Sequence, residues 1–410
     1  MITQPWLHRL RRPQARTVLL IAGLLLVAAA VAVLVDRAVF SKSAQSARPE
    51  LQRILDGLVT GRDRVAPGVT AYISGPHGTW VGSAGLANVK TGEPMRPDAP
   101  MQLDSNTKAW TAMVILQLVG EGKLRLDDTV ERWLPGLLPD GGRITVRELL
   151  NHTSGLIDNN DITTDPLGYI GKVRDPTLRS EILGTYRREQ ADPTATAPPI
   201  FFARFAAALP LRSTPGTTYH YSNIGYEIAG LIAARAGGAP LATLFRQRII
   251  EPLDLSSAAY QPQGEISGAH PRSYSLRLNG TLVDATGWYR LGEGGDAGIV
   301  ADAADEGHFL TALMQGRLLR PAQLAAMKTP PPIGSTYALG LDVDAVPCAG
   351  VAYQHSGSSY STTSSIFVSG DGKRVGVILL NGNTLAGSST LDPRAGNAAV
   401  AASRRLFCAA

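Results

Sequence analysis

A serine and a lysine stand three residues apart in the one Ser-x-x-Lys of this sequence, Ser105-Asn106-Thr107-Lys108. Apolar residues follow on almost every side of a predicted helix that ends at Gly122, so this helix is expected to be buried and rigid. Residues three apart share one helix face, which places the lysine amine beside the serine oxygen. The start of a helix also offers N–H groups where an oxyanion would form. Such a pair can transfer an acyl group through the serine.

Two further groups of residues bring a phenol and an imidazole. Tyr221-Ser222-Asn223 lies in a predicted loop, and His355-Ser356-Gly357 follows a predicted strand over residues 351–354. Unperturbed lysine and tyrosine both hold their protons to about pH 10, so one of them needs a shifted pKa to accept a proton near neutrality. The sequence leaves open whether Lys108 or Tyr221 does so. Each group alone is short enough to occur by chance, and a lone histidine is more often structural; their order and placement favour a common site.

Strand-forming segments lie at both ends of the chain, and they could join into one antiparallel sheet. The first two are separated by Gly75-Pro76-His77-Gly78, which is typical of a hairpin turn, and Gly370-Asp371-Gly372 separates two of the later ones. A mainly helical region lies between the two sets, so the sequence predicts an α+β fold and not a doubly wound one. The predicted helices are residues 51–58 and 391–407, and the predicted strands are residues 68–74, 79–84, 351–355, 362–369 and 374–381.

The first 47 residues differ from the rest of the chain. Four arginines precede an unbroken apolar run from Val18 to Val35, which at about 1.5 Å per residue is roughly 27 Å of helix, enough to cross a bilayer. Because the positive cluster precedes the run, residues 48–410 are expected outside the cytoplasmic membrane as one catalytic domain. The alternative is a signal peptide that is cleaved, leaving a secreted protein. A stretch between Asp158 and Leu211, rich in Pro, Thr and Arg, is predicted to be a surface insertion.

The charge of the chain argues against a nucleic-acid partner. The formal net charge is +5, but residues 1–47 hold six Lys or Arg and one Asp, which accounts for the whole excess. Residues 48–410 are therefore balanced, and no basic surface is expected for nucleic acid. Competing hydrolase designs find little support, because the chain has no Gly-x-Ser-x-Gly and no His-Glu-x-x-His. Its seven histidines are scattered, so neither a catalytic metal nor another cofactor is expected.

Cys348 and Cys408 both lie in the part predicted to be exported, where an oxidising environment permits a disulfide. Two buried thiols are the alternative. A bridge between them would restrict the unfolded chain and contribute about 4 kcal/mol on the chain-entropy estimate.

With these three motifs in this order, the sequence resembles the penicillin-recognising serine hydrolases. This family includes DD-carboxypeptidases, class C β-lactamases and related esterases and D-aminopeptidases. Tyr221-Ser222-Asn223 stands where some members have Ser-Asp-Asn, and His355-Ser356-Gly357 where many have Lys-Thr-Gly. The resemblance runs from about Leu51 to the end, and residues 116–124, 134–139, 144–156 and 370–373 also carry it. The ending Leu406-Phe407-Cys408 looks like that of disulfide-bearing extracellular DD-carboxypeptidases, which favours the disulfide.

The resemblance implies a β-lactamase/transpeptidase-like fold and a role for each site residue. Ser105 would be the nucleophile, with Lys108 and Tyr221 activating it. Asn223 would hold the substrate amide, and the backbone N–H groups of Ser105 and Ser358 would form the oxyanion hole. The His355 ring and the Ser358 hydroxyl would face a substrate carboxylate. Trp288 looks like a substrate-cleft aromatic, although an ordinary packed tryptophan is the alternative.

The implied activity is that of a D-Ala-D-Ala carboxypeptidase that acts on peptidoglycan peptides and is acylated by β-lactams. One departure matters: DD-carboxypeptidases of this branch place a cationic residue near the last motif, but no Lys or Arg occurs between Lys328 and Lys373. A β-lactamase-like hydrolase or an esterase of the same fold therefore stays open. So does a membrane-tethered sensor that binds wall peptides or β-lactams without turnover.

Overall fold

The computed structural model describes residues 48–61, 64–158, 161, 165–192, 199–262, 266–287, 294–385 and 391–410. The predicted membrane segment, residues 18–35, and Trp288 lie outside these ranges. Among the described residues, no single helix has the length and apolar composition of a membrane span. The pair Asn223–Gly237 and Leu241–Leu253 reaches that composition only when taken together, with a 73° bend at the break.

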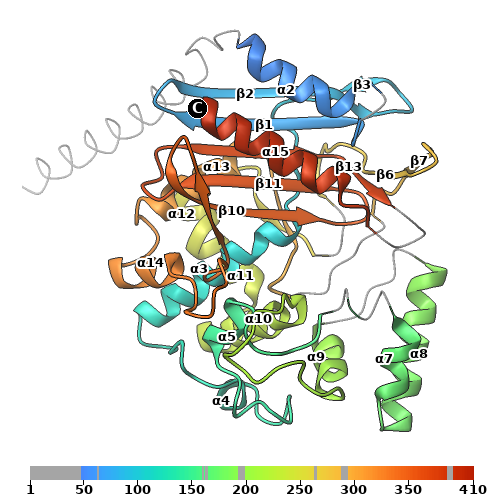
Figure 1. The fold of residues 1–410 in the computed structure, drawn as a ribbon, viewed down its shortest axis with the longest axis vertical. Helices are drawn as coiled ribbons and strands as arrows, with labels where there is room; N and C mark the ends of the chain where they lie inside the picture. Colours follow the sequence, from blue (N-terminus) through green and yellow to red (C-terminus); the bar gives the residue numbers. More distant parts are fainter. Residues whose placement is uncertain are drawn as a thin grey trace, which may run out of the picture. The chain divides into compact units, whose positions relative to one another are not determined.

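A seven-stranded antiparallel sheet contains strands from both ends of the chain, as the sequence predicted. Strand β1 pairs with β12 with Val69 opposite Leu380, so segments about three hundred residues apart lie side by side at the centre of the sheet (Figure 1). The order is β3-β2-β1-β12-β11-β10-β9. The bounds are β1 Gly68–Gly75, β2 Gly78–Asn88, β3 Glu93–Pro94, β9 Asp342–Val346, β10 Gly350–Ser358, β11 Thr363–Ser369 and β12 Val375–Leu380.

Both faces of this sheet are covered, which explains why β12 is apolar at every position but Gly376. On one face, Ile378 and Leu380 join a core cluster with Leu51 and Leu55 of α2 (Pro49–Val59) and Leu406 of α15 (Arg394–Ala409). Burying each leucine contributes about 1.5–3 kcal/mol. On the other face, alternate residues of the same strand pack against α13 (Ala303–Met314) and the helices beyond it.

Helix α15 begins later than predicted, at Arg394 instead of Leu391, because Pro393 occupies its N-cap. Near its other end, Cys408 forms a disulfide with Cys348, which lies in the turn between β9 and β10. The predicted bridge therefore ties the terminal helix to the edge of the sheet.

The middle of the chain is mainly helical, in agreement with the prediction. Helix α3 is buried at eleven of its fourteen positions, because it is apolar on all sides and lies at the centre of this region (Figure 1). Within the predicted insertion, the described residues form three helices, α7 to α9, and Phe201 and Phe205 of α9 enter the main core. The bounds are α3 Thr107–Gly120, α4 Val130–Trp133, α5 Val146–Leu150, α7 Pro166–Lys172, α8 Pro176–Ala191, α9 Pro199–Ala207, α10 Asn223–Gly237, α11 Leu241–Phe245, the π-helical turn Arg246–Ile250, α12 Glu251–Leu253 and α14 Pro321–Lys328.

Two small three-stranded sheets were not predicted, because their strands are only two to four residues long. One has the order β13-β6-β7 and the other β4-β8-β5. Strand β8 runs between β4 and β5 and lies directly before α13, so it connects the sheet side of the molecule to the helical region. The bounds are β4 Met101–Gln102, β5 Ala259–Tyr260, β6 Tyr274–Arg277, β7 Leu282–Asp284, β8 Ile299–Ala301 and β13 Gly382–Leu385.

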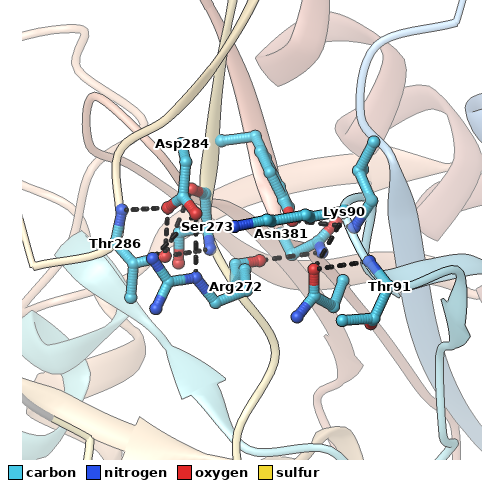
Figure 2. A network of polar contacts seen from close by, with 10 residues as sticks. Lys90, Thr91, Arg272, Ser273, Asp284, Thr286 and Asn381 are labelled. Atoms are coloured by element: carbon cyan, nitrogen blue, oxygen red, sulfur yellow. Dashed lines mark hydrogen bonds and ion pairs between the residues drawn. The ribbon is translucent and has the colours of Figure 1, made fainter.

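A fully buried asparagine joins the large sheet to the segment that contains β6 and β7. Asn381 Oδ1 accepts from the Gly68 amide at 2.7 Å, and its Nδ2 donates to the carbonyls of Leu86 and Arg272 at 3.0 and 2.9 Å. Figure 2 shows Asn381 beside Arg272, whose guanidinium pairs with Asp284. Three separate segments are therefore held by one side chain.

We expect Asn381→Ala to lower the free energy of unfolding by about 2–4 kcal/mol, because it leaves buried N–H and C=O groups without partners. Urea denaturation followed by circular dichroism measures the change. Asn279→Ala, on the exposed turn between β6 and β7, is the matched control and should cost less than about 1 kcal/mol. Equal losses in the two variants would contradict this account of Asn381.

Candidate active site

Ser105 lies in a single 3₁₀ turn, Asp104–Asn106, that precedes α3. The sequence predicted it at the start of the helix itself. Asp104 has φ 49°, in the left-handed region that costs most side chains free energy but that Asp tolerates better. This conformation turns the chain so that Ser105 is partly exposed while the residues on both sides of it are buried. The α-helix begins only at Thr107.

Hydrogen bonds clamp this turn to the segment before β11 and to β11 itself. The Thr362 hydroxyl donates to Asp104 Oδ2 at 2.8 Å, and Asn106 Nδ2 donates to Ser364 Oγ at 2.8 Å. Ser364 in turn donates to the Leu103 carbonyl at 2.7 Å. The position of the serine is therefore fixed by the sheet as well as by the helix.

Gly357 lies against the turn that carries Ser105. In the structure, a Cβ at this position would lie 2.3 Å from the Leu103 carbonyl oxygen and 2.9 Å from Asp104 Cβ. Only glycine allows β10 to pack this closely against the turn that carries Ser105.

Lys108 is fully buried, and its amine contacts the serine. Its Nζ lies 3.0 Å from Ser105 Oγ, and it also donates to Asn223 Oδ1 at 2.6 Å and to the Asp296 carbonyl at 3.0 Å. These three acceptors hold the amine in one place, one helical turn from the serine, as the spacing of the two residues predicted.

Burial lowers the pKa of Lys108 from 10.5 to about 8, and four nearby carboxylic acids, Asp296, Asp158, Glu227 and Asp104, oppose that shift. Burial also raises the pKa of Asp296, and burial together with the charge of Asp296 raises the pKa of Glu227 well above its ordinary value. Lys108 is thus able to lose its proton near neutral pH, which an exposed lysine does not do.

The phenol of Tyr221 reaches the same oxygen from the other side. Its OH donates to Ser105 Oγ at 3.1 Å. Burial raises its pKa above the ordinary 10, so the phenol holds its proton across the neutral range. Of the two groups that the sequence left open, these pKa directions favour Lys108 as the proton acceptor and Tyr221 as the proton donor.

Asn223 follows Tyr221 at the first position of α10, and Ser222 caps that helix by accepting from the Gly225 amide at 3.1 Å. The Asn223 Oδ1 accepts from Lys108, and the backbone N–H of Asn223 donates to Asp158 Oδ1 at 2.8 Å. Its clearest role is to hold the lysine. The contact to a substrate amide that the resemblance implied stays a prediction.

The His355 ring is buried inside the protein, where both of its nitrogens have partners. Nε2 lies 2.9 Å from the Tyr337 hydroxyl and Nδ1 lies 2.7 Å from the Ser356 carbonyl. Burial lowers its pKa to about 3, so the ring is neutral. A neutral, fully partnered imidazole does not supply positive charge to a carboxylate, and the contact with a substrate carboxylate that the resemblance implied stays a prediction.

Ser356 and Ser358 lie on the opposite face of β10 from the histidine ring. Ser356 is opposite Ser365, whose hydroxyl meets Ser403 of α15, and a Cβ on Gly396 of α15 would lie 3.9 Å from Ser358 Oγ. The resemblance implied that the Ser358 hydroxyl and the His355 ring face the same carboxylate, whereas in the structure they lie on opposite faces of β10. The histidine motif, predicted at the end of a strand, lies within β10, which continues to Ser358.

One edge of β10 is open beside the serine. Strand β9 pairs with β10 only as far as Gln354, so within the described part of the chain residues 355–358 have no strand on the side away from β11. An open edge offers backbone N–H and C=O groups to an extended ligand. Ser358, the predicted second oxyanion donor, lies on this stretch.

Sequence reasoning missed several residues of the site. His152 contacts the ring of Tyr221, Tyr337 bonds His355, and Asp296, Asp158 and Glu227 surround the lysine. His152 lies in the segment 144–156 that carried part of the resemblance, which was the one available signal. The others come from separate segments without a spacing that connects them. No cluster of three potential metal ligands occurs among the described residues.

The beta-lactamase family profile matches residues 51–401, so the chain belongs to the beta-lactamase family. The fold and the contact of Ser105 with Lys108 and Tyr221 agree with this class of serine hydrolases.

Among curated proteins, the chain is similar to esterase EstB of Burkholderia gladioli, with 30% identity over 55% of this chain and 54% of the esterase. It is also similar to penicillin-binding protein 4* of Bacillus subtilis, with 26% identity over 58% of this chain and 45% of that protein. The matches thus span about half the length of these relatives. Among solved structures, the D-stereospecific amidohydrolase from Streptomyces sp. is 29% identical, with a TM-score of 0.68, and the match covers 85% of this chain and 97% of that one.

Proposed function

We propose that this protein hydrolyses small acyl substrates through an acyl-enzyme formed on Ser105. The observation that carries the proposal is the position of Ser105 Oγ, which lies 3.0 Å from Lys108 Nζ and 3.1 Å from the Tyr221 hydroxyl. One neighbour can accept the serine proton and the other can supply a proton to the leaving group.

In the first step, neutral Lys108 takes the proton from Ser105 as the serine oxygen attacks the substrate carbonyl carbon. The negative charge that develops on the carbonyl oxygen is stabilised by the amides predicted for the oxyanion hole, those of Ser105 and Ser358. The bond to the leaving group then breaks, and Tyr221 gives its proton to the departing nitrogen or oxygen. The ammonium of Lys108 restores the phenol. Water repeats the sequence on the acyl-enzyme and releases the acid.

The finer proposal is a D-Ala-D-Ala carboxypeptidase that acts on peptidoglycan peptides and is acylated by β-lactams. The three sequence motifs and the similarity to penicillin-binding protein 4* support it. In this proposal the catalytic domain lies outside the membrane, because arginines precede the apolar run of residues 18–35. The protein is either anchored by that run or secreted after its cleavage. Fractionation of cells that express the full chain, with an immunoblot of membrane and medium, tests the location; a purely cytosolic chain would contradict it.

An ester or amide substrate without a carboxylate is the second candidate. The specific observation is the lack of a cation along β9 to β11: residues 329–372, all of them described, contain no Lys or Arg, and His355 is neutral. A terminal carboxylate would have no ionic partner on these strands. The similarity to an esterase and to an amidohydrolase supports this alternative.

The deciding experiment incubates the full chain separately with a D-Ala-D-Ala-ended peptide, a penicillin and a simple ester. Intact-mass spectrometry detects the acyl adduct, and peptide mapping locates it. Release of D-alanine supports the carboxypeptidase, and turnover of the ester alone supports the second candidate. An adduct that persists for hours on every substrate would indicate a sensor. No adduct on Ser105 with any of the three would overturn the proposal.

A further inference from the structure

His152 is a fully buried histidine that the mechanism above does not use. It lies in the turn after α5, with φ 60°, and its ring contacts the rings of four tyrosines, two of them more closely than the others. The centroid of its ring is 4.3 Å from that of Tyr221 and 4.5 Å from that of Tyr337. Tyr337 in turn bonds His355 on β10. His152 therefore connects the loop of the proton donor to the strand at the edge of the site.

The backbone on both sides of Tyr221 is bound to this one histidine. The His220 amide donates to the His152 carbonyl at 2.8 Å, and the Ser222 amide donates to His152 Nδ1 at 3.1 Å. The residues directly before and after the tyrosine are thus fixed. Two hydrogen bonds and one ring contact from the same residue leave Tyr221 little freedom to leave the serine.

The hydrogen bond from Ser222 requires Nδ1 to be unprotonated, because a ring nitrogen that accepts cannot carry a hydrogen. Burial and the neighbouring Lys108 lower the pKa of His152 well below 6.5, so the ring is neutral and its proton is on Nε2. Within the described part of the chain Nε2 has no hydrogen-bond partner. Among the described residues, the hydrogen bond from the Ser222 amide to Nδ1 is therefore the one that the imidazole ring makes.

We infer that His152 is a positioning residue that, through its Nδ1 acceptor, holds the Tyr221 phenol against Ser105 and so sets how well the enzyme assists a poor leaving group. This inference rests on the proposed function. The expected loss of rate is selective for substrates with a poor leaving group. A p-nitrophenolate leaves without a proton, whereas an alkoxide needs one, and a placed acid contributes about 10²–10⁴-fold to such a step.

The test compares p-nitrophenyl butyrate with ethyl butyrate, two esters with the same acyl group, in three variants of the full chain. His152→Phe keeps a ring but has no acceptor, and His152→Gln carries its amide too far out to replace Nδ1. His152→Asn keeps an acceptor close to the place of Nδ1, and asparagine tolerates the positive φ. Tyr221→Phe serves as the benchmark for complete loss of the proton donor.

We expect His152→Phe and His152→Gln to lower the single-turnover rate of acylation by ethyl butyrate by about 30-fold or more, while the ester concentration for half-maximal acylation changes less than about threefold. Their rate of acylation by p-nitrophenyl butyrate should fall less than about threefold, and His152→Asn should stay within about fivefold of wild type on both esters. His308→Phe is the matched control, since His308 also stands against a tyrosine, Tyr72, but outside the site; the ratio of the two rates should not change.

An equal fall on both esters in all three His152 variants, with a matching loss of thermal stability, would overturn the inference and leave only a packing role. Unchanged rates would overturn it as well. If His152→Phe fails to fold, the comparison of the Gln and Asn variants decides the same point. Failure of wild type on both esters, with no adduct on Ser105, would instead refute the proposed function itself.

Discussion

Replacing Ser105 with alanine is expected to abolish acyl-enzyme formation and to lower kcat/KM on the accepted substrate by about 10⁴-fold or more. The reason is the loss of the one oxygen that both Lys108 and Tyr221 contact. The fold should be kept, because Ser105 is partly exposed and the clamp on its turn uses Asp104 and Asn106. Intact-mass spectrometry after exposure to a fluorescent penicillin or an activated ester measures the effect.

Ser180→Ala is the matched control, since this serine is exposed on α8, and it should be acylated at the wild-type rate. Labelling of the Ser105→Ala variant to the wild-type level would disprove the assignment of the nucleophile. If wild type, Ser105→Ala and Ser180→Ala all stay unlabelled, the acyl-enzyme mechanism as a whole is refuted.

The second large effect is expected at Lys108, where Lys108→Met should slow acylation by about 10³-fold. Methionine fills much of the same buried volume but cannot accept a proton. Lys108→Arg should be equally slow at every pH, because a guanidinium keeps its proton. Stopped-flow measurement of the acylation rate gives both values. A Met variant within tenfold of wild type would assign the base to another group.

The pH dependence of wild type follows from the same residue. Because the base must be neutral and burial lowers its pKa to about 8, kcat/KM should rise about tenfold per unit below that pH and level off above it. The direction is that of a depressed lysine pKa, since the reactive form gains population as pH rises. About one-tenth of the protein is in that form at pH 7. A profile that stays flat from pH 6 to 9 would argue against Lys108 as the base.

The strands of the large sheet, its hairpins and the pairing of Ser105 with Lys108 could be predicted from local patterns. Alternating and apolar segments at both ends of the chain indicated the strands, and the turns at residues 75–78 and 370–372 indicated the hairpins, because these signals depend only on neighbouring residues. The pairing of Ser105 with Lys108 followed from helical spacing. Its small error, a 3₁₀ turn instead of the first α-helical turn, arises because Asp104 adopts a positive φ that tertiary hydrogen bonds hold.

The roles of single side chains in the last motif depended on the other segments. The resemblance implied that His355 faces a substrate carboxylate, and only the fold showed that its Nε2 meets Tyr337, eighteen residues earlier, inside the protein. Gly357 has its role because of Leu103, more than two hundred and fifty residues away. Contacts of this kind leave no spacing in the sequence from which they could be deduced.

By itself, the sequence determined an α+β chain with a serine and a lysine on one turn and a separate tyrosine able to join them, because periodicity and turn chemistry are local. Only the tertiary structure decided which group holds its proton. The lysine meets Asp296, the tyrosine meets His152, and the lysine amine is withdrawn from water. A pKa depends on everything within a few ångströms of the group, and those neighbours come together only when the chain is folded.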